Sequence, residues 1–259
     1  MTDRPLKGVG VLVTRPRAQA AELVELIQNN GGNAICFPVI DILPRDKSAI
    51  AADRALLPPP DIALFVSRNA VAHGIAHAEG AIKGAIGPST AAAIESSGQT
   101  VEIQPATGFD SESLLAEPTL LNVSGKTVRI IRGDDGRELL ADTLRERGAT
   151  VDYLSVYERV LPACSPELLA KVETTWRGGG LHAITVMSVR TLKNLIELLP
   201  DWCKQRIDNV PLVTPAARVI KEALNYCPLS KPFLASGPQA NDMVDAIIAT
   251  QRTDSGPAK

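Results

Sequence analysis

The sequence carries one order of segments twice, and this repeat constrains the fold more than any other feature. An apolar, β-branched run over 9–15 (VGVLVTR) is followed by apolar residues at helical spacing over 19–28, then by two glycines and a second apolar run over 34–42. The same order returns with TVRIIR at 127–132, a helical pattern over 138–147, Gly148 and an extended run over 151–160. Each copy predicts a strand, a helix with a glycine stop, and a second strand.

The repeat continues further along both halves. Residues 61–71 (DIALFVSRNAV) are similar to residues 182–192 (HAITVMSVRTL), and the matching serines are Ser67 and Ser188. A proline followed by an Ala-rich helix occurs over 86–98 and again over 213–226, and a Gly-containing turn before a helix over 107–115 and 236–247. Because every unit is a strand followed by a helix, we predict an α/β fold with parallel sheets in two similar domains of about 120 residues.

Two divisions of the chain into domains fit this pattern. If each repeat is one domain, the boundary falls near residue 125. The extended stretches at about 36–44 and 152–162 can instead be two linkers that cross between domains. The segment between the linkers is then an inserted domain, and the two ends of the chain together form the other domain.

Composition excludes several classes of protein. Lys and Arg number 27 against 29 Asp and Glu, and aromatic residues make up only 3%, so we expect no nucleic-acid partner. No apolar run approaches the ~18–20 residues of a membrane span, and the first residues lack the apolar segment of a secretory signal. We therefore expect a protein without membrane contact in the cytoplasm, where its four cysteines stay as free thiols.

Polar side chains follow the predicted strands at their carboxyl ends, where parallel sheets bind ligands and helix N-termini present amide donors. Their hydroxyl, amide and guanidinium groups suit carboxylate or phosphate, so we predict an anionic ligand between the two halves. For each single Ser or Thr, capping of the next helix is the open alternative. The candidate binding residues are Thr14, Arg15, Ser67, Asn69, Ser89, Thr90, Arg132, Gly133, Ser188, Arg190 and Thr214.

Common cofactor and metal motifs are missing from the sequence. No G-x-G-x-x-G follows the first strand, no G-x-S-x-G is present, and Gly125-Lys126-Thr127 has Leu120 where a phosphate-binding loop needs glycine. His73 and His77 are four residues apart without a third ligand, and the acids at 134–135 are interpreted as complementing a helix dipole. We predict no metal and no cofactor.

Tyr157 is the candidate catalytic residue. It lies in the polar extended stretch SVYER, beside Glu158 and Arg159. A phenol with its usual pKa near 10 is protonated at pH 7 and can donate a proton or a hydrogen bond. The alternative is an amphipathic tyrosine whose ring is packed and whose hydroxyl is in water.

Taken together, the motifs VLVTRP, FPVIDI, LFVSRNAV, GPSTA, LRERGA and VYER resemble the uroporphyrinogen-III synthase family of haem biosynthesis, from about Val9 to Ile248. The resemblance implies two flavodoxin-like α/β domains with parallel sheets, joined by a two-stranded extended linker. It therefore favours the inserted arrangement, with residues 1–40 and 160–259 in one discontinuous domain and residues 41–159 in the other.

The resemblance also implies an activity. Such enzymes are cyclising lyases that convert hydroxymethylbilane, a linear tetrapyrrole with eight carboxylates, to uroporphyrinogen III with inversion of the terminal pyrrole ring and loss of water. They are monomers that need neither cofactor nor metal. Tyr157 matches the tyrosine of the family's linker strand and is the candidate to assist departure of the hydroxide. One turn departs from the family pattern, because Thr214 is followed by Pro215-Ala216-Ala217 where relatives are often rich in Ser and Thr.

A second class of function fits the same pattern. Two similar α/β lobes about a hinge also describe a non-catalytic binding or sensor protein for a small anion. In both cases we expect the angle between the lobes to vary and to close on the ligand. The polar stretch over 251–259, which contains Gly and Pro, is expected to be disordered.

Overall fold

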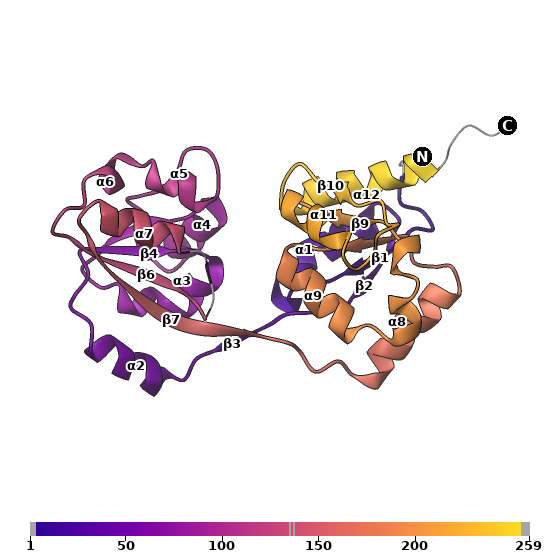
Figure 1. Ribbon diagram of the computed structural model, residues 1–259, viewed down its shortest axis with the longest axis horizontal. Helices are drawn as coiled ribbons and strands as arrows, with labels where there is room; N and C mark the ends of the chain where they lie inside the picture. The colour runs from indigo at the N-terminus through magenta and orange to yellow at the C-terminus, as the bar shows by residue number, and fades with distance from the viewer. Residues whose placement is uncertain (1–3, 135, 137, 255–259) are drawn as a thin grey trace. The chain divides into compact units, whose positions relative to one another are not determined.

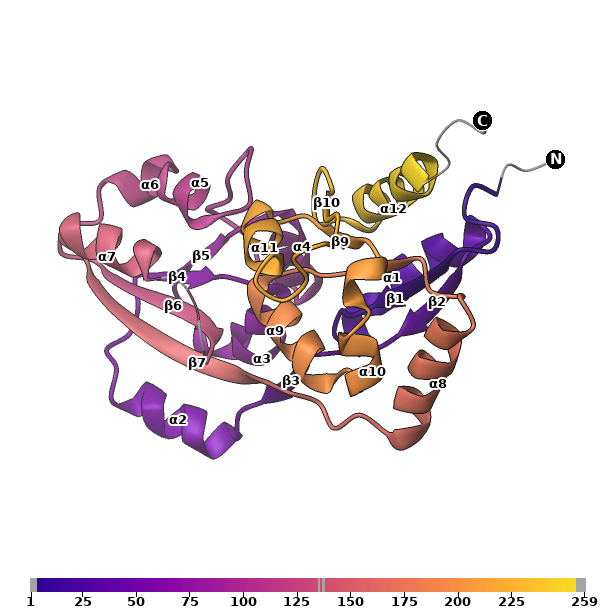
Figure 2. The same ribbon diagram turned by 45° about the vertical axis from the view of Figure 1, so that its right-hand side comes forward.

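The computed structural model describes residues 4–134, 136 and 138–254. The chain divides into two compact units, and each is described by itself. The first unit comprises Met1–Asp41 and Leu161–Lys259, and the second comprises Ile42–Val160. Each unit is built on a five-stranded sheet in which parallel strand pairs dominate (Figures 1 and 2).

The sheet of the first unit has the order β10-β9-β8-β1-β2, with every neighbouring pair parallel. Numbered along the chain within the unit, this order reads 5-4-3-1-2. The strands are β1 (Gly10–Val13), β2 (Asn33–Cys36), β8 (Ala183–Thr185), β9 (Leu212–Thr214) and β10 (Phe233–Leu234). The helices are α1 (Arg17–Asn29), α8 (Pro166–Arg177), α9 (Val189–Leu198), α10 (Asp201–Lys204), the 3-10 helix η2 (Ile207–Asn209), α11 (Ala217–Ala223) and α12 (Ala240–Asp254).

The sheet of the second unit has the order β3-β7-β6-β4-β5, and Ile103 makes a parallel bridge to Gly84 on the far side of β5. The strands are β3 (Asp41–Pro44), β4 (Ile62–Phe65), β5 (Ile82–Ala85), β6 (Thr127–Gly133) and β7 (Thr150–Val160). The helices are α2 (Lys47–Ala55), α3 (Arg68–Gly74), the 3-10 helix η1 (Ile75–His77), α4 (Pro88–Ser96), α5 (Ser111–Leu115), α6 (Pro118–Leu121) and α7 (Leu139–Glu146).

The sequence repeat maps onto the two sheets strand by strand. β6, β7, β4 and β5 match β1, β2, β8 and β9, and the bridge at Ile103 takes the place of β10. The matched strands therefore follow one spatial order in both sheets, although the chain enters them at different strands, and β3 is an additional edge strand of the second sheet. The predicted α/β class with parallel sheets is confirmed.

Period-two alternation divides the core of the second unit between the two faces of its sheet. Ala63 and Phe65 pack with residues of α3 and α4, whereas Ile62 and Leu64 pack with residues of α5 and α7. In Figure 1, α3 and α7 accordingly lie on different sides of the β4–β6–β7 ladder. In the first unit, α1 and α12 cover the face that carries Val11 and Val13.

Three boundaries differ from the sequence predictions. The run over 34–42 is divided into the separate strands β2 and β3, because Pro38 lacks the N–H that a continuing strand donates. The polar stretch after Gln251 was expected to be disordered, yet α12 continues to Asp254; the remaining residues of that stretch lie outside the described part. The extended stretch from 152 is not solely a linker, because β7 pairs with β6 from Thr150 to Tyr157.

Candidate functional site

Ser67 and Ser188 occupy matching places in the two units. Each follows a central strand in an extended conformation and caps the next helix. The Oγ of Ser67 accepts from the Ala70 N–H at 3.0 Å, and that of Ser188 accepts from the Thr191 N–H at 3.1 Å. The capping alternative is therefore true of both residues, and any contact with a ligand is made in addition to it.

The structure brings Tyr157 of β7 to Ser67. The Tyr157 hydroxyl lies 3.1 Å from Ser67 Oγ and accepts a hydrogen bond from Arg159 Nη2 at 2.8 Å. The Tyr157 side chain is fully buried, so its hydroxyl is not in water as the packing alternative required. Arg159 was not among the predicted site residues. Only its position two residues after Tyr157, on the same side of an extended chain, could have indicated it.

A bulge in β7 directs the Tyr157 ring into the core between the sheet and the helices α3 and α4. Arg132 of β6 is paired with Ser155, but the next residue, Gly133, is paired with Tyr157, so Val156 is extra. Such a bulge shifts the alternation of side chains. Leu154, Val156 and Tyr157 consequently all pack in the same core, on the face that carries α3 and α4.

Gly133 is the residue that makes room for this ring. A Cβ atom at Gly133 would lie 2.6 Å from Cε2 and 2.8 Å from Cζ of Tyr157, which is closer than packed atoms approach. Gly133 was predicted as a binding residue. Its observed role is to let the β6 backbone pass directly against the phenol ring.

Asp134 fixes the backbone on both sides of Tyr157. Its N–H donates to the Tyr157 carbonyl at 3.0 Å, and its Oδ1 accepts from the Arg159 N–H at 3.1 Å. The interpretation of Asp134 as a helix-dipole residue was wrong, because α7 begins only at Leu139. Its neighbour in that interpretation, residue 135, lies outside the described residues.

The contact between Ser67 and Tyr157 allows two positions of the Tyr157 hydroxyl proton. A hydroxyl donates one hydrogen bond and accepts two, and either partner can be the donor between Ser67 and Tyr157. When Tyr157 donates to Ser67, its proton is occupied. When Ser67 donates instead, the phenol oxygen accepts from both Ser67 and Arg159, and its own proton is available to a ligand.

Arg132 is engaged with neighbouring side chains. Its Nη1 lies 3.2 Å from Glu138 Oε1, and its guanidinium carbon lies 4.5 Å from the centre of the Tyr153 ring. The hydrogen bond from the Tyr153 hydroxyl lowers the pKa of Glu138. Burial, followed by this hydrogen bond to Glu138, raises the pKa of Tyr153 to about 12.

The other predicted residues of the second unit lie in the first turns of helices. Asn69 is half-buried in α3, after β4. Ser89 is exposed and Thr90 is buried in α4, whose N-cap is Gly87. The sequence thus placed all three correctly at strand ends, but the Thr90 side chain faces the core.

In the first unit the two threonines serve the fold. Thr14 is fully buried, and its hydroxyl donates to the Thr185 carbonyl of β8. Thr214 is also fully buried, and its Oγ1 accepts from the Ala216 N–H at 3.2 Å. Neither side chain has an exposed surface, and their role as ligand contacts stays a prediction.

The two arginines of the first unit are more accessible. Arg15 is half-buried, and its Nη2 donates to the Pro238 carbonyl in the turn before α12 at 2.6 Å. Arg190 is half-buried in the first turn of α9, two residues after the cap Ser188. These guanidinium groups and the N-terminus of α9 favour negative charge near the carboxyl ends of β1 and β8.

Two further searches concern the described residues alone. They contain no group of three or more His, Cys, Asp or Glu side chains that could hold a metal ion. No helix among them is both long enough and apolar enough to span a bilayer.

Comparison with known proteins agrees with this architecture. Residues 21–245 match the family model described as uroporphyrinogen-III synthase HemD. The uroporphyrinogen-III synthase of Escherichia coli (strain K12) is 33% identical over 208 residues, which cover 76% of this chain and 82% of that protein. The enzyme of the same name from Salmonella typhimurium (strain LT2) is 33% identical over 218 residues, with the same coverage.

Two solved structures share the fold. A mutant uroporphyrinogen III synthase from the extremely thermophilic bacterium Thermus thermophilus superimposes with a TM-score of 0.60 at 19% identity, covering 95% of this chain and 99% of that one. The uroporphyrinogen-III synthetase of Helicobacter pylori 26695 superimposes with a TM-score of 0.61 at 13% identity, covering 93% and 99%. The family model spans most of the sequence, and the chain belongs to the uroporphyrinogen-III synthase family.

Proposed function

We propose that this chain cyclises hydroxymethylbilane to uroporphyrinogen III, with inversion of the terminal pyrrole ring and loss of water, as a lyase of tetrapyrrole biosynthesis. The observation that carries the proposal is the family match over residues 21–245, together with the 33% identity to enzymes of that name. We further propose that it works as a cytoplasmic monomer without cofactor or metal, as the family resemblance implies.

The two units act in this proposal as flavodoxin-like domains, and strand order supports that description. The order 2-1-3-4-5 is that of flavodoxin-like sheets, in which ligands bind beyond the carboxyl ends of the strands. The chain passes between the units at 41–42 and again at 160–161. We assign the two-stranded linker to the segments around these positions, which include the ends of β3 and β7.

Tyr157 is the proposed general acid. When the bond from carbon to the hydroxyl of the hydroxymethyl group breaks, the phenol gives its proton to the departing hydroxide, and water leaves. Arg159 stabilises the phenolate through the hydrogen bond it already makes, and Ser67 orients the oxygen. The proton lost by the pyrrole carbon on ring closure restores the phenol. Since Tyr157 is buried, the substrate reaches it only after neighbouring side chains move.

Eight carboxylates require distributed donors on a chain of net charge −2. Three or four charge-assisted hydrogen bonds of about 1.5–3 kcal/mol each are enough for micromolar affinity. The remaining task is to hold a flexible tetrapyrrole in a closed form that permits inversion of one ring. The proposed donors are the accessible polar residues at the strand ends, namely Arg15, Asn69, Ser89, Arg132, Ser188 and Arg190.

The direct test is the identity of the product. Hydroxymethylbilane closes spontaneously to the I isomer, so the purified chain is incubated with it and the isomers are separated after oxidation to porphyrins. We expect the III isomer in excess, and only the I isomer with heat-denatured protein. Formation of the I isomer alone by folded protein that still binds the substrate would favour the non-catalytic binding or sensor function instead.

A further inference from the structure

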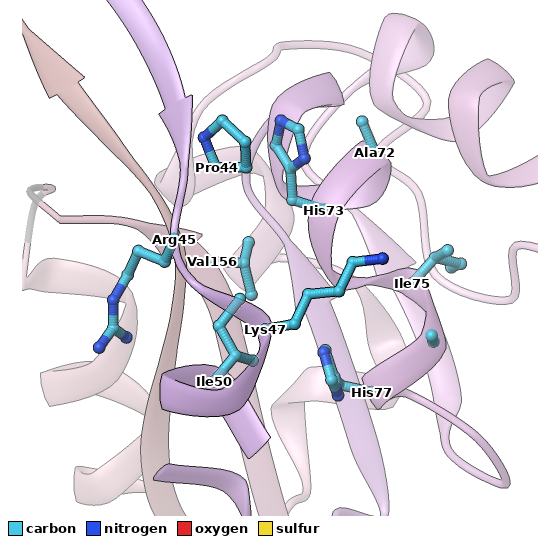
Figure 3. Close-up of a pocket in the computed structure, with 10 residues that line it drawn as sticks. Pro44, Arg45, Lys47, Ile50, Ala72, His73, Ile75, His77 and Val156 are labelled. Carbon is cyan, nitrogen blue, oxygen red and sulfur yellow. The ribbon is translucent and has the colours of Figure 1, made fainter. Parts of the chain in front are cut away.

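A pocket of about 360 Å³ lies within the second unit, apart from the Ser67–Tyr157–Arg159 contacts. It is formed between β3 with the start of α2 on one side and α3 with η1 on the other, and Val156 of β7 contributes to its wall (Figure 3). Its size is within the range of pockets that hold small molecules.

The charged groups of this pocket are all basic. None of its ten described lining residues is acidic, and four of them are Arg45, Lys47, His73 and His77. The carboxylates of α2 and of its N-cap are already engaged. Asp46 caps α2 by accepting from backbone N–H groups, and Asp53 pairs with Arg45 at 2.8 Å.

Lys47 is the cation that this arrangement leaves available. Its side chain is exposed, and in Figure 3 it extends from the start of α2 toward α3. Within the described part of the chain it makes no ion pair or hydrogen bond. Burial, with the charges of Arg54 and Arg129 as smaller causes, lowers the pKa of His77, so the His77 ring is a neutral donor near pH 7.

The rest of the wall is apolar. Ile50 is buried, Ile75 is half-buried, and Val156 and Pro44 complete this side of the pocket. A ligand that fits must therefore combine one anionic group with a compact apolar body. A carboxylate suits both an ammonium and imidazole N–H groups, because its ionised oxygens accept a charge-assisted hydrogen bond from either donor.

We propose that this pocket binds a carboxylate group carried on a compact apolar body, with the Lys47 ammonium as its ion-pair partner and His73 and His77 as hydrogen-bond donors. Two sources share this chemistry: an acidic side chain of the tetrapyrrole substrate, and a free small carboxylic acid.

The pocket lies next to Tyr157, so a bound carboxylate can influence the position of the Tyr157 side chain. The His73 ring centre lies 6.3 Å from that of Tyr157, with the rings inclined at 51°. Val156, which lines the pocket, is the extra residue of the bulge that turns Tyr157 into the core. An occupant therefore touches two neighbours of the proposed general acid, and this step alone rests on the proposed function.

The binding test uses 3-phenylpropionate as the probe. Its amide, 3-phenylpropionamide, has nearly the same shape without the charge and is the control compound. Proton NMR follows the imidazole signals of the three histidines in the full chain. We expect saturable shifts for His73 and His77 and none for His182, which lies in the first unit and accepts from the Gly10 N–H. The amide is expected to bind about tenfold to a hundredfold more weakly, the factor that one charge-assisted hydrogen bond supplies.

Two lysine variants complete the test. Lys47→Met is expected to lower the affinity for 3-phenylpropionate by the same factor, and Lys47→Arg is expected to restore part of that affinity. Lys126→Met is the matched control, because Lys126 is an exposed lysine of the same unit that lies 3.8 Å from Asp61. Absence of saturable shifts at His73 and His77, equal affinity for the amide, or unchanged affinity in Lys47→Met would each overturn the proposal.

Kinetics then separates the two sources. If the pocket holds a substrate side chain, 3-phenylpropionate competes with hydroxymethylbilane and Lys47→Met raises KM. If it holds a free acid, 3-phenylpropionate changes the rate without competing and Lys47→Met leaves KM unchanged. Either result retains the carboxylate site. If the chain forms no III isomer, the proposed function fails, while the NMR result still decides whether the pocket binds a carboxylate.

Discussion

The two units differ at one matched pair of positions, in β1 and β2 of the first unit and in β6 and β7 of the second. In the first unit, β1 and β2 place Leu12 opposite Ile35, and both side chains are buried and apolar. In the second, β6 and β7 place Arg129 opposite Asp152 at the same point of the repeat. Arg129 is 1% exposed, and its Nε and Nη2 reach the two carboxylate oxygens of Asp152 at 2.7 and 3.1 Å. One architecture thus accommodates either an apolar contact or a buried ion pair.

A second difference concerns the caps that follow the central strands. Ser67 and Ser188 cap their helices alike, but the Ser188 hydroxyl turns to the Thr191 hydroxyl at 2.9 Å, whereas that of Ser67 meets Tyr157. In the first unit the ladder between β1 and β2 ends at Cys36, which matches Tyr153, and so stops before the position of the bulge. The repeat therefore supplies the scaffold, and the bulge in β7 brings Tyr157, the proposed general acid, to Ser67.

The largest effect is expected from Tyr157→Phe. The ring and its packing are kept while the proton donor is lost, and general acids contribute about 10²–10⁴-fold to rate. We expect kcat for formation of the III isomer to fall by about that factor, with KM nearly unchanged. Initial rates measured on protein with an unchanged circular dichroism spectrum provide the check.

Tyr153→Phe is the matched control for this variant. It removes a hydroxyl from the same strand, on the face of the sheet that does not carry Tyr157. Its kcat should stay close to that of the unaltered chain. Equal rates for all three proteins would remove Tyr157 from the mechanism and make the Ser67–Tyr157 contact structural.

The ion pair that distinguishes the units gives the next largest effect. Asp152→Ala leaves the Arg129 guanidinium buried with the Pro58 carbonyl as its other described acceptor. Losing one partner of a buried pair costs about 3–5 kcal/mol of unfolding free energy. Asp53→Ala, which breaks the more exposed pair with Arg45, should cost no more than about 1 kcal/mol. Urea unfolding compares the variants, and similar losses in the two would contradict the burial argument.

The third largest effect is expected from Gly133→Ala. The added Cβ meets the Tyr157 ring at 2.6 Å, and overpacking of a core typically costs about 1–3 kcal/mol. We also expect kcat to fall, because the phenol is pushed from Ser67 and Arg159. Gly178→Ala serves as the control, since a Cβ there meets its nearest atom at 3.4 Å. A Gly133→Ala protein with unaltered melting temperature and rate would show that the ring has room to move.

Smaller losses are expected from Ser67→Ala and Ser188→Ala. Each removes an N-cap and should lower the unfolding free energy by about 0.5–2 kcal/mol. Only Ser67→Ala should also reduce kcat, because only Ser67 touches Tyr157. Thermal unfolding and initial rates measured on both variants separate the shared capping role from the role found in the second unit alone.

The sequence predicted those features that depend on local pattern. Strand-helix alternation and the repeated serines foretold the sheets and both caps, since a Ser after a buried strand is a common N-cap. The strand-end rule placed Asn69 and Arg190 in first helical turns, as observed. These features are encoded within a few neighbouring residues, so one sequence suffices to find them.

Features that arise from pairing were not predictable in this way. The bulge at Val156 depends on the register between β6 and β7, whose paired residues are more than 20 positions apart in the sequence. The Arg159 and Asp134 contacts follow from that bulge. The burial of Thr14 and Thr214 was not predictable for a related reason, because a hydroxyl at a strand end can bond to a neighbouring strand, as Thr14 does, or to its own turn, as Thr214 does.

The smallest expected effect concerns the alkaline limit of the second unit. Tyr153 takes the place that Cys36 has in β2, and its pKa is raised to about 12, first by burial and then by Glu138. Between the unfolded value near 10 and the folded value, the unfolded chain loses this proton first. Unfolding is therefore favoured as pH rises through that window, and the contribution of Tyr153 is fully present below it. Urea unfolding at about pH 9 and about pH 11 should show a steeper loss in the unaltered chain than in Tyr153→Phe. Equal losses would mean that Tyr153 titrates alike in both states, and that the Tyr153–Glu138 contact does not distinguish the second unit from the first.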